Sequence, residues 1–222
     1  MRILVTRPEP GASATAQRLA AMGHAPMLAP CLAISPLRPS LPEHPAAVVI
    51  TSGQAIDALP DAWTALPVFC VGDATAGRLR AAGFHRVESA AGDAEDLFKL
   101  VTARAVPGLH VLAVGERQGV ALERRLRAAG LQVARRKVYA ARPLRALPGE
   151  AAQALAAGAL DAALFYSAET ARSFVRLRPE GTGKMLACAL SERVAGSLHG
   201  LPWREIRVAL APSEMDLMAL IS

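Results

Sequence analysis

Residues 3–22 read ILVTRPEPGASATAQRLAAM, a short apolar run followed by a segment rich in Ala. The run at 3–6 predicts a β-strand and residues 12–22 predict a helix. Further strands are predicted at residues 48–51, 68–71, 87–89, 111–114, 133–139, 163–166, 187–190 and 206–210. Each of them except 133–139 leads into a predicted helix. This alternation is typical of a mostly parallel sheet covered by helices, so the sequence predicts an α/β fold.

The strand–helix–strand pattern of the opening recurs after about 107 residues, so that Leu19 corresponds to Leu126 and Gly23 to Gly130. Two other pairs of segments correspond in the same way. They are VVITSGQAIDAL (48–59) with ALFYSAETARSF (163–174), and VGDATAGRLRAAG (71–83) with LSERVAGSLHGLP (190–202). Because turn residues match as well as Ala and Leu, the pattern indicates a diverged tandem duplication.

Two proline-rich segments separate these blocks: SPLRPSLPEHP at 35–45 and RPLRALPG at 142–149. Proline cannot continue a helix, so both segments are predicted to be stiff, extended connectors. They are compatible with a discontinuous domain that carries an inserted one. The pattern alone also allows a simple division into a first and a second half.

Length and composition limit the number of domains and the kind of protein that the sequence can form. The 222 residues, 52% of them hydrophobic, suffice for one large domain or for two domains of about 100 residues, and two are favoured. No stretch approaches the roughly 20 apolar residues of a membrane span, and Arg7 and Pro8 come too early for a signal-peptide core. A cytoplasmic protein without a membrane partner is expected. Cys31, Cys70 and Cys188 are far apart in apolar runs and are predicted to be buried thiols rather than disulfide or zinc ligands.

The net charge of +6 indicates an anionic partner. Aromatic residues make up only 4% of the chain, and neither a stacking stripe nor a zinc-finger spacing is present, which disfavours nucleic acid. A small polycarboxylate or phosphate ligand fits better. The alternative is that arginines on solvated helix faces only keep the protein in solution.

Ligands of open α/β sheets gather at the carboxyl ends of the strands, so the strand-to-helix turns are the candidate binding residues. These turns are small and polar at 51–53, 72–75, 91–93, 115–116, 167–168 and 191–192. Their backbone N–H groups and the positive ends of helix dipoles are suited to carboxylates. The alternative interpretation of each turn is ordinary N-capping.

The sequence lacks the motifs of several enzyme classes. It has neither a G-x-G-x-x-G after a strand nor a G-x-x-x-x-G-K-[ST], which disfavours nicotinamide and nucleoside triphosphate enzymes. The five histidines have no metal-binding spacing and suggest no catalytic triad. No cofactor and no metal are expected.

Tyr139 ends the strand that feeds the second connector, so a phenol is expected beside the hinge. The alternative is an amphipathic side chain at a strand edge. The other tyrosine, Tyr166, is interpreted as a core residue.

From end to end, the chain resembles the bacterial uroporphyrinogen-III synthases. The resemblance is carried, in order, by ILVTRPE, VVITSGQAI, VFCVGDATAGRLRAAGF, SAAGDAEDL, VYAARPL, LFYSAETARSF and APSEMDLMALI. It implies two flavodoxin-like domains, each a parallel sheet with helices on both faces, joined by a two-stranded linker with a cleft between them. The implied division is a discontinuous domain of residues 1–35 plus 142–222 and an inserted domain of residues 36–141.

The resemblance also implies an activity. Family members are cyclising lyases that close hydroxymethylbilane, a linear tetrapyrrole, with inversion of ring D and loss of water, to give uroporphyrinogen III in porphyrin and heme biosynthesis. A monomer without a cofactor is expected. Two alternatives are a non-catalytic, two-lobed module that binds or senses a small anion, and an unrelated flavin or nucleotide enzyme.

The implied site contains one catalytic side chain. Tyr139 matches the tyrosine that the family is thought to use to help the hydroxyl leave, directly or through water. Substrate-binding residues are expected at Ser52, Gly72, Thr75, Gly92, Gly115, Ser167 and Ser191, with Arg7 and Arg117 as carboxylate partners. Where the family often has a threonine in the last of these turns, this chain has Val194, so an essential hydroxyl there is in doubt.

Overall fold

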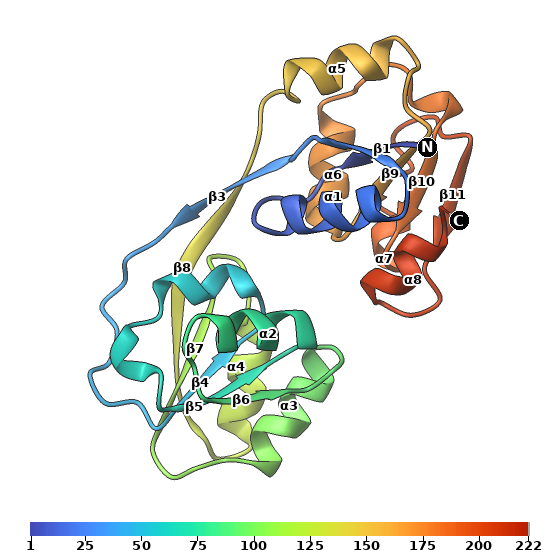
Figure 1. Cartoon of the computed structure of the whole chain (residues 1–222). Helices are drawn as coiled ribbons and strands as arrows, with labels where there is room; N and C mark the ends of the chain where they lie inside the picture. Colours follow the sequence, from blue (N-terminus) through green and yellow to red (C-terminus); the bar gives the residue numbers. More distant parts are fainter. Residues whose placement is uncertain (222) are drawn as a thin grey trace. The chain divides into compact units, whose positions relative to one another are not determined.

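The computed structural model describes residues 1–221 (Figure 1). The chain forms two compact units. Unit 1 comprises Met1–Ala33 together with the chain from Arg142 onward, and unit 2 comprises Ile34–Ala141. Unit 1 is therefore assembled from both ends of the chain.

Unit 1 contains a five-stranded sheet in the order β11-β10-β9-β1-β2, with every neighbouring pair parallel. Its strands are β1 (Arg2–Val5), β2 (Ala25–Leu28), β9 (Ala162–Phe165), β10 (Leu186–Ala189) and β11 (Glu205–Val208). Its helices are α1 (Gly11–Ala21), α5 (Gly149–Ala156), α6 (Ala168–Arg176), η3 (Thr182–Lys184), α7 (Glu192–Ala195) and α8 (Glu214–Ala219). The strands predicted at 3–6, 163–166, 187–190 and 206–210 are confirmed to within one or two residues.

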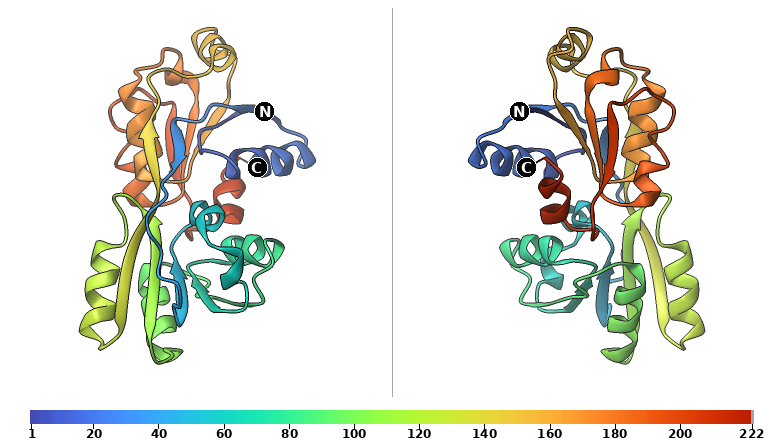
Figure 2. Two further views of the ribbon diagram at one scale, coloured as in Figure 1. Left: turned by 90° about the vertical axis from the view of Figure 1, so that its left-hand side faces the viewer. Right: turned by 90° about the vertical axis from the view of Figure 1, so that its right-hand side faces the viewer.

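Two hydrophobic clusters cover the two faces of this sheet. Helices α5, α6 and α7 contribute to one cluster, and α1 and α8 to the other. The ribbons of Figure 2 show these two sets of helices on opposite sides of the sheet. Phe165 from β9 and Phe174 from α6 meet edge to face, with ring centroids 5.3 Å apart. Burying both faces of a parallel sheet requires strands that are apolar throughout, which is why β9 reads AALF without polar alternation.

The sheet of unit 2 contains the strands β4 (Ala47–Ile50), β5 (Pro67–Cys70), β6 (Arg86–Ser89), β7 (Leu109–Gly115) and β8 (Gln132–Pro143), with β3 (Leu32–Pro36) at its edge. The first two residues of β3 and the last two of β8 belong to unit 1. The order is β3-β8-β7-β4-β5-β6, and β8 through β6 run parallel. Helices α3 (Ala94–Ala103) and α4 (Val120–Ala128) cover one face. The 3₁₀ segments η1 (Gly53–Ala58) and η2 (Asp61–Trp63) and helix α2 (Asp73–Ala81) cover the other.

One predicted helix has a different form. The segment after β4 forms 3₁₀ turns instead of an α-helix. Leu59 precedes Pro60 and is extended, with φ −83° and ψ 134°. Proline disfavours the helical conformation of the residue before it, so the helical turns that begin at Gly53 end at Ala58.

The internal repeat reappears in the strand order. When β1-α1-β2 is matched with β7-α4-β8, and β9, β10 and β11 with β4, β5 and β6, the two sheets have the same order. Unit 2 thus has the pattern of unit 1 with its first strand–helix–strand block moved to the end. This agrees with the duplication that the sequence indicates.

Proline-rich chain leads from one unit to the other. Residues 37–46 contain no helix or strand after β3, and β8 ends at Pro143. Strands β3 and β8 are hydrogen-bonded neighbours. Beyond the end of β3, the backbone N–H of Leu37 donates to the carbonyl of Val138 at 2.8 Å. The predicted extended form is present at 35–36 in β3 and at 142–143 in β8, whereas most of the rest of each connector is irregular, with bends at 43–44 and 145–146.

The three cysteines are buried and free. Burial raises the pKa of Cys31 and Cys188 to about 12 and that of Cys70 to about 11, because the low-dielectric interior disfavours the thiolate. The sequence-based interpretation as buried thiols is confirmed.

We therefore expect the folded protein to resist alkylation by iodoacetamide at pH 8, because the thiolate is the reacting species and is scarce. Mass spectrometry should show an unmodified native chain and addition of one group per cysteine after unfolding in guanidinium chloride. Rapid modification of the native chain would contradict the buried, raised-pKa state of these thiols.

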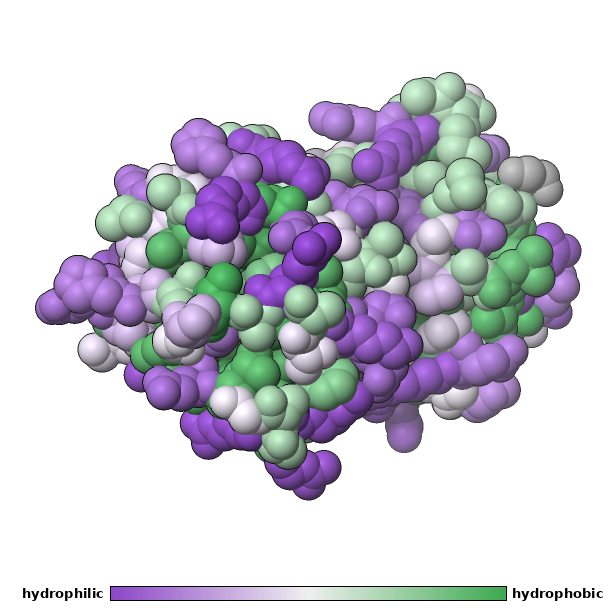
Figure 3. Space-filling view, turned by 90° about the horizontal axis from the view of Figure 1, so that it is seen from below, coloured by the Kyte–Doolittle hydropathy of each residue, from purple (hydrophilic) through white to green (hydrophobic). Residues whose placement is uncertain are grey.

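None of the helices in residues 1–221 is long and apolar enough to cross a bilayer. In the same residues, no three His, Cys, Asp or Glu side chains are grouped so that they could hold a metal ion. On the face drawn in Figure 3, hydrophilic residues are interspersed with smaller hydrophobic patches.

Candidate functional site

The carboxyl edge of the unit 2 sheet collects most of the predicted site residues. The strands β8, β7, β4, β5 and β6 are parallel neighbours, so the residues at their carboxyl ends follow one another along a single edge. In that order the residues are Tyr139, Gly115, Ser52, Gly72 and Gly92. Strand β8 runs on to Pro143, and Tyr139 lies level with this edge because it pairs with Gly115, the last residue of β7. Topology thus brings together positions that are spread widely over the sequence.

Tyr139 is held tightly at one end of this edge. Its side chain is only 4% exposed, and its hydroxyl donates a 2.8 Å hydrogen bond to Oε1 of Gln118. A register shift at the end of β7 pairs Gly115 with Tyr139. A Cβ atom at Gly115 would lie 2.9 Å from the tyrosine ring, so only glycine leaves room for it. Gln118, which the sequence reasoning missed, orients the phenol.

The turns after β4 and β5 differ in whether a side chain accepts a hydrogen bond from their backbone N–H groups. The Ser52 hydroxyl caps η1 by accepting from the N–H of Gln54 at 3.3 Å. Helix α2 begins after Gly72 without a side-chain cap, and a side chain at Gly72 would meet open space. Thr75 is half-buried in the first turn of α2. The start of α2 is therefore open to an outside acceptor.

The turn at Gly92 carries its own carboxylates. Asp93 accepts from the N–H groups of Glu95 at 2.7 Å and Asp96 at 3.3 Å, while Asp96 accepts from the N–H of Asp93. These backbone hydrogen bonds lower the pKa of Asp93. The amides that were expected to receive a ligand are already occupied, and the local charge repels an anion. Gly92 is the least suited of the predicted turns.

Arg117 lies just beyond the same edge. Its side chain is exposed, and within residues 1–221 it forms no hydrogen bond or ion pair. A guanidinium in this state can rotate freely toward an anion, although solvent weakens any single contact.

In unit 1, Arg7, Ser167 and Ser191 follow the adjacent strands β1, β9 and β10. The Ser167 hydroxyl caps α6 by accepting from the N–H of Thr170 at 3.1 Å. Ser191 begins α7 without a side-chain cap. Val194 is 4% exposed and packs in the core cluster beneath α7. The three predicted residues of unit 1 therefore lie along one sheet edge.

Arg7 is already engaged within its own unit. Oε1 of Glu214 accepts from Thr15 at 2.8 Å, from the Tyr166 hydroxyl at 2.9 Å and from Arg7 at 3.4 Å. Arg18 binds the other carboxylate oxygen. The guanidinium of Arg7 also stacks 4.0 Å from the centre of the Tyr166 ring. We call these five residues the Glu214 cluster.

The Glu214 cluster revises the interpretation of Tyr166. Its ring packs against the core, but its hydroxyl belongs to a polar network. Burial raises the pKa of Tyr166, and Thr15 and Arg7 oppose that shift. The sequence reasoning did not single out Glu214, whose only signal was its place at the start of the closing helix.

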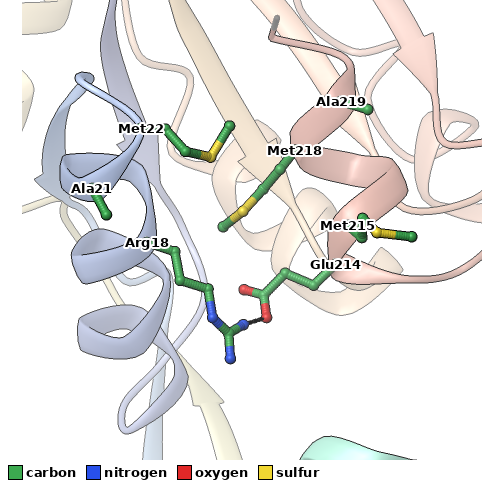
Figure 4. Close-up of a pocket in the computed structure, with 7 residues that line it drawn as sticks. All are labelled: Arg18, Ala21, Met22, Glu214, Met215, Met218 and Ala219. Carbon is green, nitrogen blue, oxygen red and sulfur yellow. Dashed lines mark hydrogen bonds and ion pairs between the residues drawn. The ribbon is translucent and has the colours of Figure 1, made fainter.

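Next to this cluster, α1 and α8 border a groove of about 590 Å³. Figure 4 shows Met22 and Met218 facing each other across it, with the Arg18–Glu214 pair at one end. The walls of this groove are therefore apolar, and the end formed by Arg18 and Glu214 is charged.

The fold defines an α/β protein of two compact units, each with a parallel sheet. The parallel sheets place small residues, hydroxyls and unpaired cations at strand ends, where such proteins bind their ligands. The chain belongs to the uroporphyrinogen-III synthase family, since the family model described as "Uroporphyrinogen-III synthase HemD" matches residues 13–219. Members of the family are cyclising lyases of porphyrin biosynthesis.

Solved structures agree at the level of the fold. The uroporphyrinogen-III synthetase of Helicobacter pylori 26695 is 17% identical, with a TM-score of 0.66 over 100% of this chain and 98% of that chain. A mutant uroporphyrinogen III synthase of the extremely thermophilic bacterium Thermus thermophilus is 18% identical, with a TM-score of 0.53 over 100% and 96% of the two chains. A comparison with curated proteins found no match.

Proposed function

We propose that this protein, a cytoplasmic monomer, converts hydroxymethylbilane to uroporphyrinogen III. The family match, which extends through both units, carries this proposal. The substrate bears an acetate and a propionate on every ring, and the net charge of +6 suits it. No observation favours a non-catalytic anion-binding or sensor module over this activity.

We further propose that the two compact units are flavodoxin-like domains and that the carboxyl edge of each sheet contributes substrate contacts. It is supported by the strand order, since β2-β1-β9-β10-β11 corresponds to the flavodoxin order 2-1-3-4-5. The uncapped starts of α2 and α7 support it too, because free N–H groups at helix starts bind carboxylates. Ser52, Thr75, Gly115 and the Ser167 turn complete the proposed contacts.

The reaction begins with departure of the terminal hydroxyl. The carbon–oxygen bond breaks with its electrons on oxygen, which takes a proton and leaves as water, and the pyrrole N–H loses its proton to give an azafulvene. The substituted carbon of ring D attacks the azafulvene, and the resulting spiro intermediate fragments and recloses with that ring inverted. Uncatalysed closure at the unsubstituted carbon gives isomer I, so the protein must chiefly impose geometry.

Tyr139 is the proposed proton donor to the departing hydroxyl. Its proton points to Gln118 Oε1. The two ends of an amide group can exchange by rotation. In the rotated state, the Gln118 NH₂ group donates to the phenol oxygen, which frees the tyrosine proton and stabilises the phenolate that remains. The pyrrole proton released in the same step can restore the phenol.

The activity is tested with freshly generated hydroxymethylbilane. After oxidation, chromatography should show the type III isomer as the main product with enzyme and isomer I without it. A product that contains isomer I alone would overturn the proposed function.

A further inference from the structure

The half-buried arginines of residues 1–221 differ in whether the guanidinium has a protein acceptor. These arginines are Arg7, Arg78, Arg125, Arg135 and Arg136. Four have protein acceptors: the Glu214 cluster for Arg7, Glu95 for Arg125, Glu123 for Arg135 and the Ser40 carbonyl for Arg136. Within residues 1–221, the guanidinium of Arg78 makes no hydrogen bond or ion pair. Because a partly buried cation without an acceptor is costly, an external partner is indicated.

Arg78 reaches a predicted binding turn. It extends from α2 to the turn after β4, where its guanidinium occupies the space that a side chain at residue 53 would fill. A Cβ atom built on Gly53 would contact Nη1 and would lie 3.1 Å from the guanidinium carbon. The cation therefore rests on the Ser52–Gly53 backbone, at the carboxyl end of β4.

Two neighbouring groups also lack a side-chain hydrogen-bond partner. The hydroxyl of Thr51, the first residue after β4, is buried without a hydrogen-bond partner. Helix α2, which follows the adjacent strand β5, starts at Gly72 without a side-chain cap. A cation and a hydroxyl without hydrogen-bond partners thus lie near a helix start without a side-chain cap, at neighbouring strand ends.

We propose that Arg78 and the Thr51–Gly53 turn form a carboxylate subsite at the carboxyl end of β4. A planar guanidinium binds a carboxylate through two parallel hydrogen bonds, and partial burial strengthens them. The subsite rests on the proposed function, because it receives an acetate or propionate group of hydroxymethylbilane. Arg78 is a binding residue in this scheme and takes no part in proton transfer.

The test compares variants that alter the guanidinium with a matched control. Arg78→Gln removes the charge, and Gly53→Ala keeps it but displaces it from the turn. Arg86→Gln is the control, since Arg86 is an exposed arginine of the same unit at the opposite, amino end of β6. KM and kcat are measured with hydroxymethylbilane, and the Kd of uroporphyrin I, an unreactive octacarboxylate, by fluorescence titration.

We expect Arg78→Gln to raise KM and the uroporphyrin Kd by about tenfold, the ordinary worth of a charged hydrogen bond, with kcat and Tm nearly unchanged. Gly53→Ala should shift both constants in the same direction, and Arg86→Gln should change them less than about twofold. Equal constants for Arg78→Gln and Arg86→Gln would overturn the subsite. If the wild type made only isomer I, the proposed function would fail. The uroporphyrin titration would still show whether Arg78 binds a carboxylate group.

Discussion

Tyr139→Phe is expected to lower kcat for uroporphyrinogen III formation by about tenfold or more, the usual contribution of a general acid. This substitution removes only the phenol hydroxyl group. The ring that packs against Gly115 stays in place, so KM and thermal stability should hardly change. Because slow loss of water leaves free substrate to close by itself, the fraction of isomer I should rise. Initial rates and chromatography of the oxidised products measure both effects.

The controls for this prediction use the second tyrosine and the phenol's partner. Tyr166→Phe removes a hydroxyl in the Glu214 cluster and should leave kcat unchanged. Gln118→Leu removes the partner of Tyr139 and should lower kcat only while Tyr139 is present, a non-additivity that a double-mutant cycle detects. An unaltered kcat in Tyr139→Phe would reduce Tyr139 to a packing role.

Glu214→Ala is expected to lower the free energy of unfolding of unit 1 by about 2 kcal/mol. The carboxylate accepts hydrogen bonds from four side chains, and its loss leaves Arg7 and Tyr166 without their shared acceptor. The figure is below that of a fully buried pair because Arg7 is 30% and Arg18 is 55% exposed. Calorimetry should show a fall in Tm of about 4–8 °C for a chain of this length.

Glu205→Ala is the matched control for the Glu214 cluster. Glu205 pairs with a single exposed arginine, Arg207, in the same unit, and such surface pairs contribute little to stability. Its Tm should therefore stay within error of the wild type. Equal Tm values for Glu205→Ala and Glu214→Ala would show that the Glu214 cluster does not hold α8 in place.

Local patterns were enough to predict nine of the strands in residues 1–221, the helix starts and the turn residues of the candidate site. Strand β2 was implied by the opening strand–helix–strand pattern without bounds, and β3 was missed. Apolar runs, prolines and N-cap residues act over a few neighbours, so their effect is readable without a tertiary structure. Even the occupied turn at Gly92 had a signal, because Asp93 and Asp96 have the spacing of a capping box. The 3₁₀ turns after β4 were missed although Pro60 was visible.

Partners of the charged side chains could not be predicted in this way. Arg7 and Glu214 are 207 positions apart in the sequence, and nothing near either residue indicates the other. Arg78 lacks any motif that separates it from the other arginines of the chain. Its lack of a partner is visible only when every acceptor within reach is known.

The sequence by itself determined an α/β protein of duplicated strand–helix blocks with small residues at its strand ends. The tertiary structure alone decided which cations remain unpaired there and which are neutralised within the chain. The physical reason is the distance along the sequence over which each interaction acts. Backbone conformation depends on adjacent residues, whereas a guanidinium or a phenol several bonds from the backbone finds its acceptor on whichever distant segment the fold brings beside it.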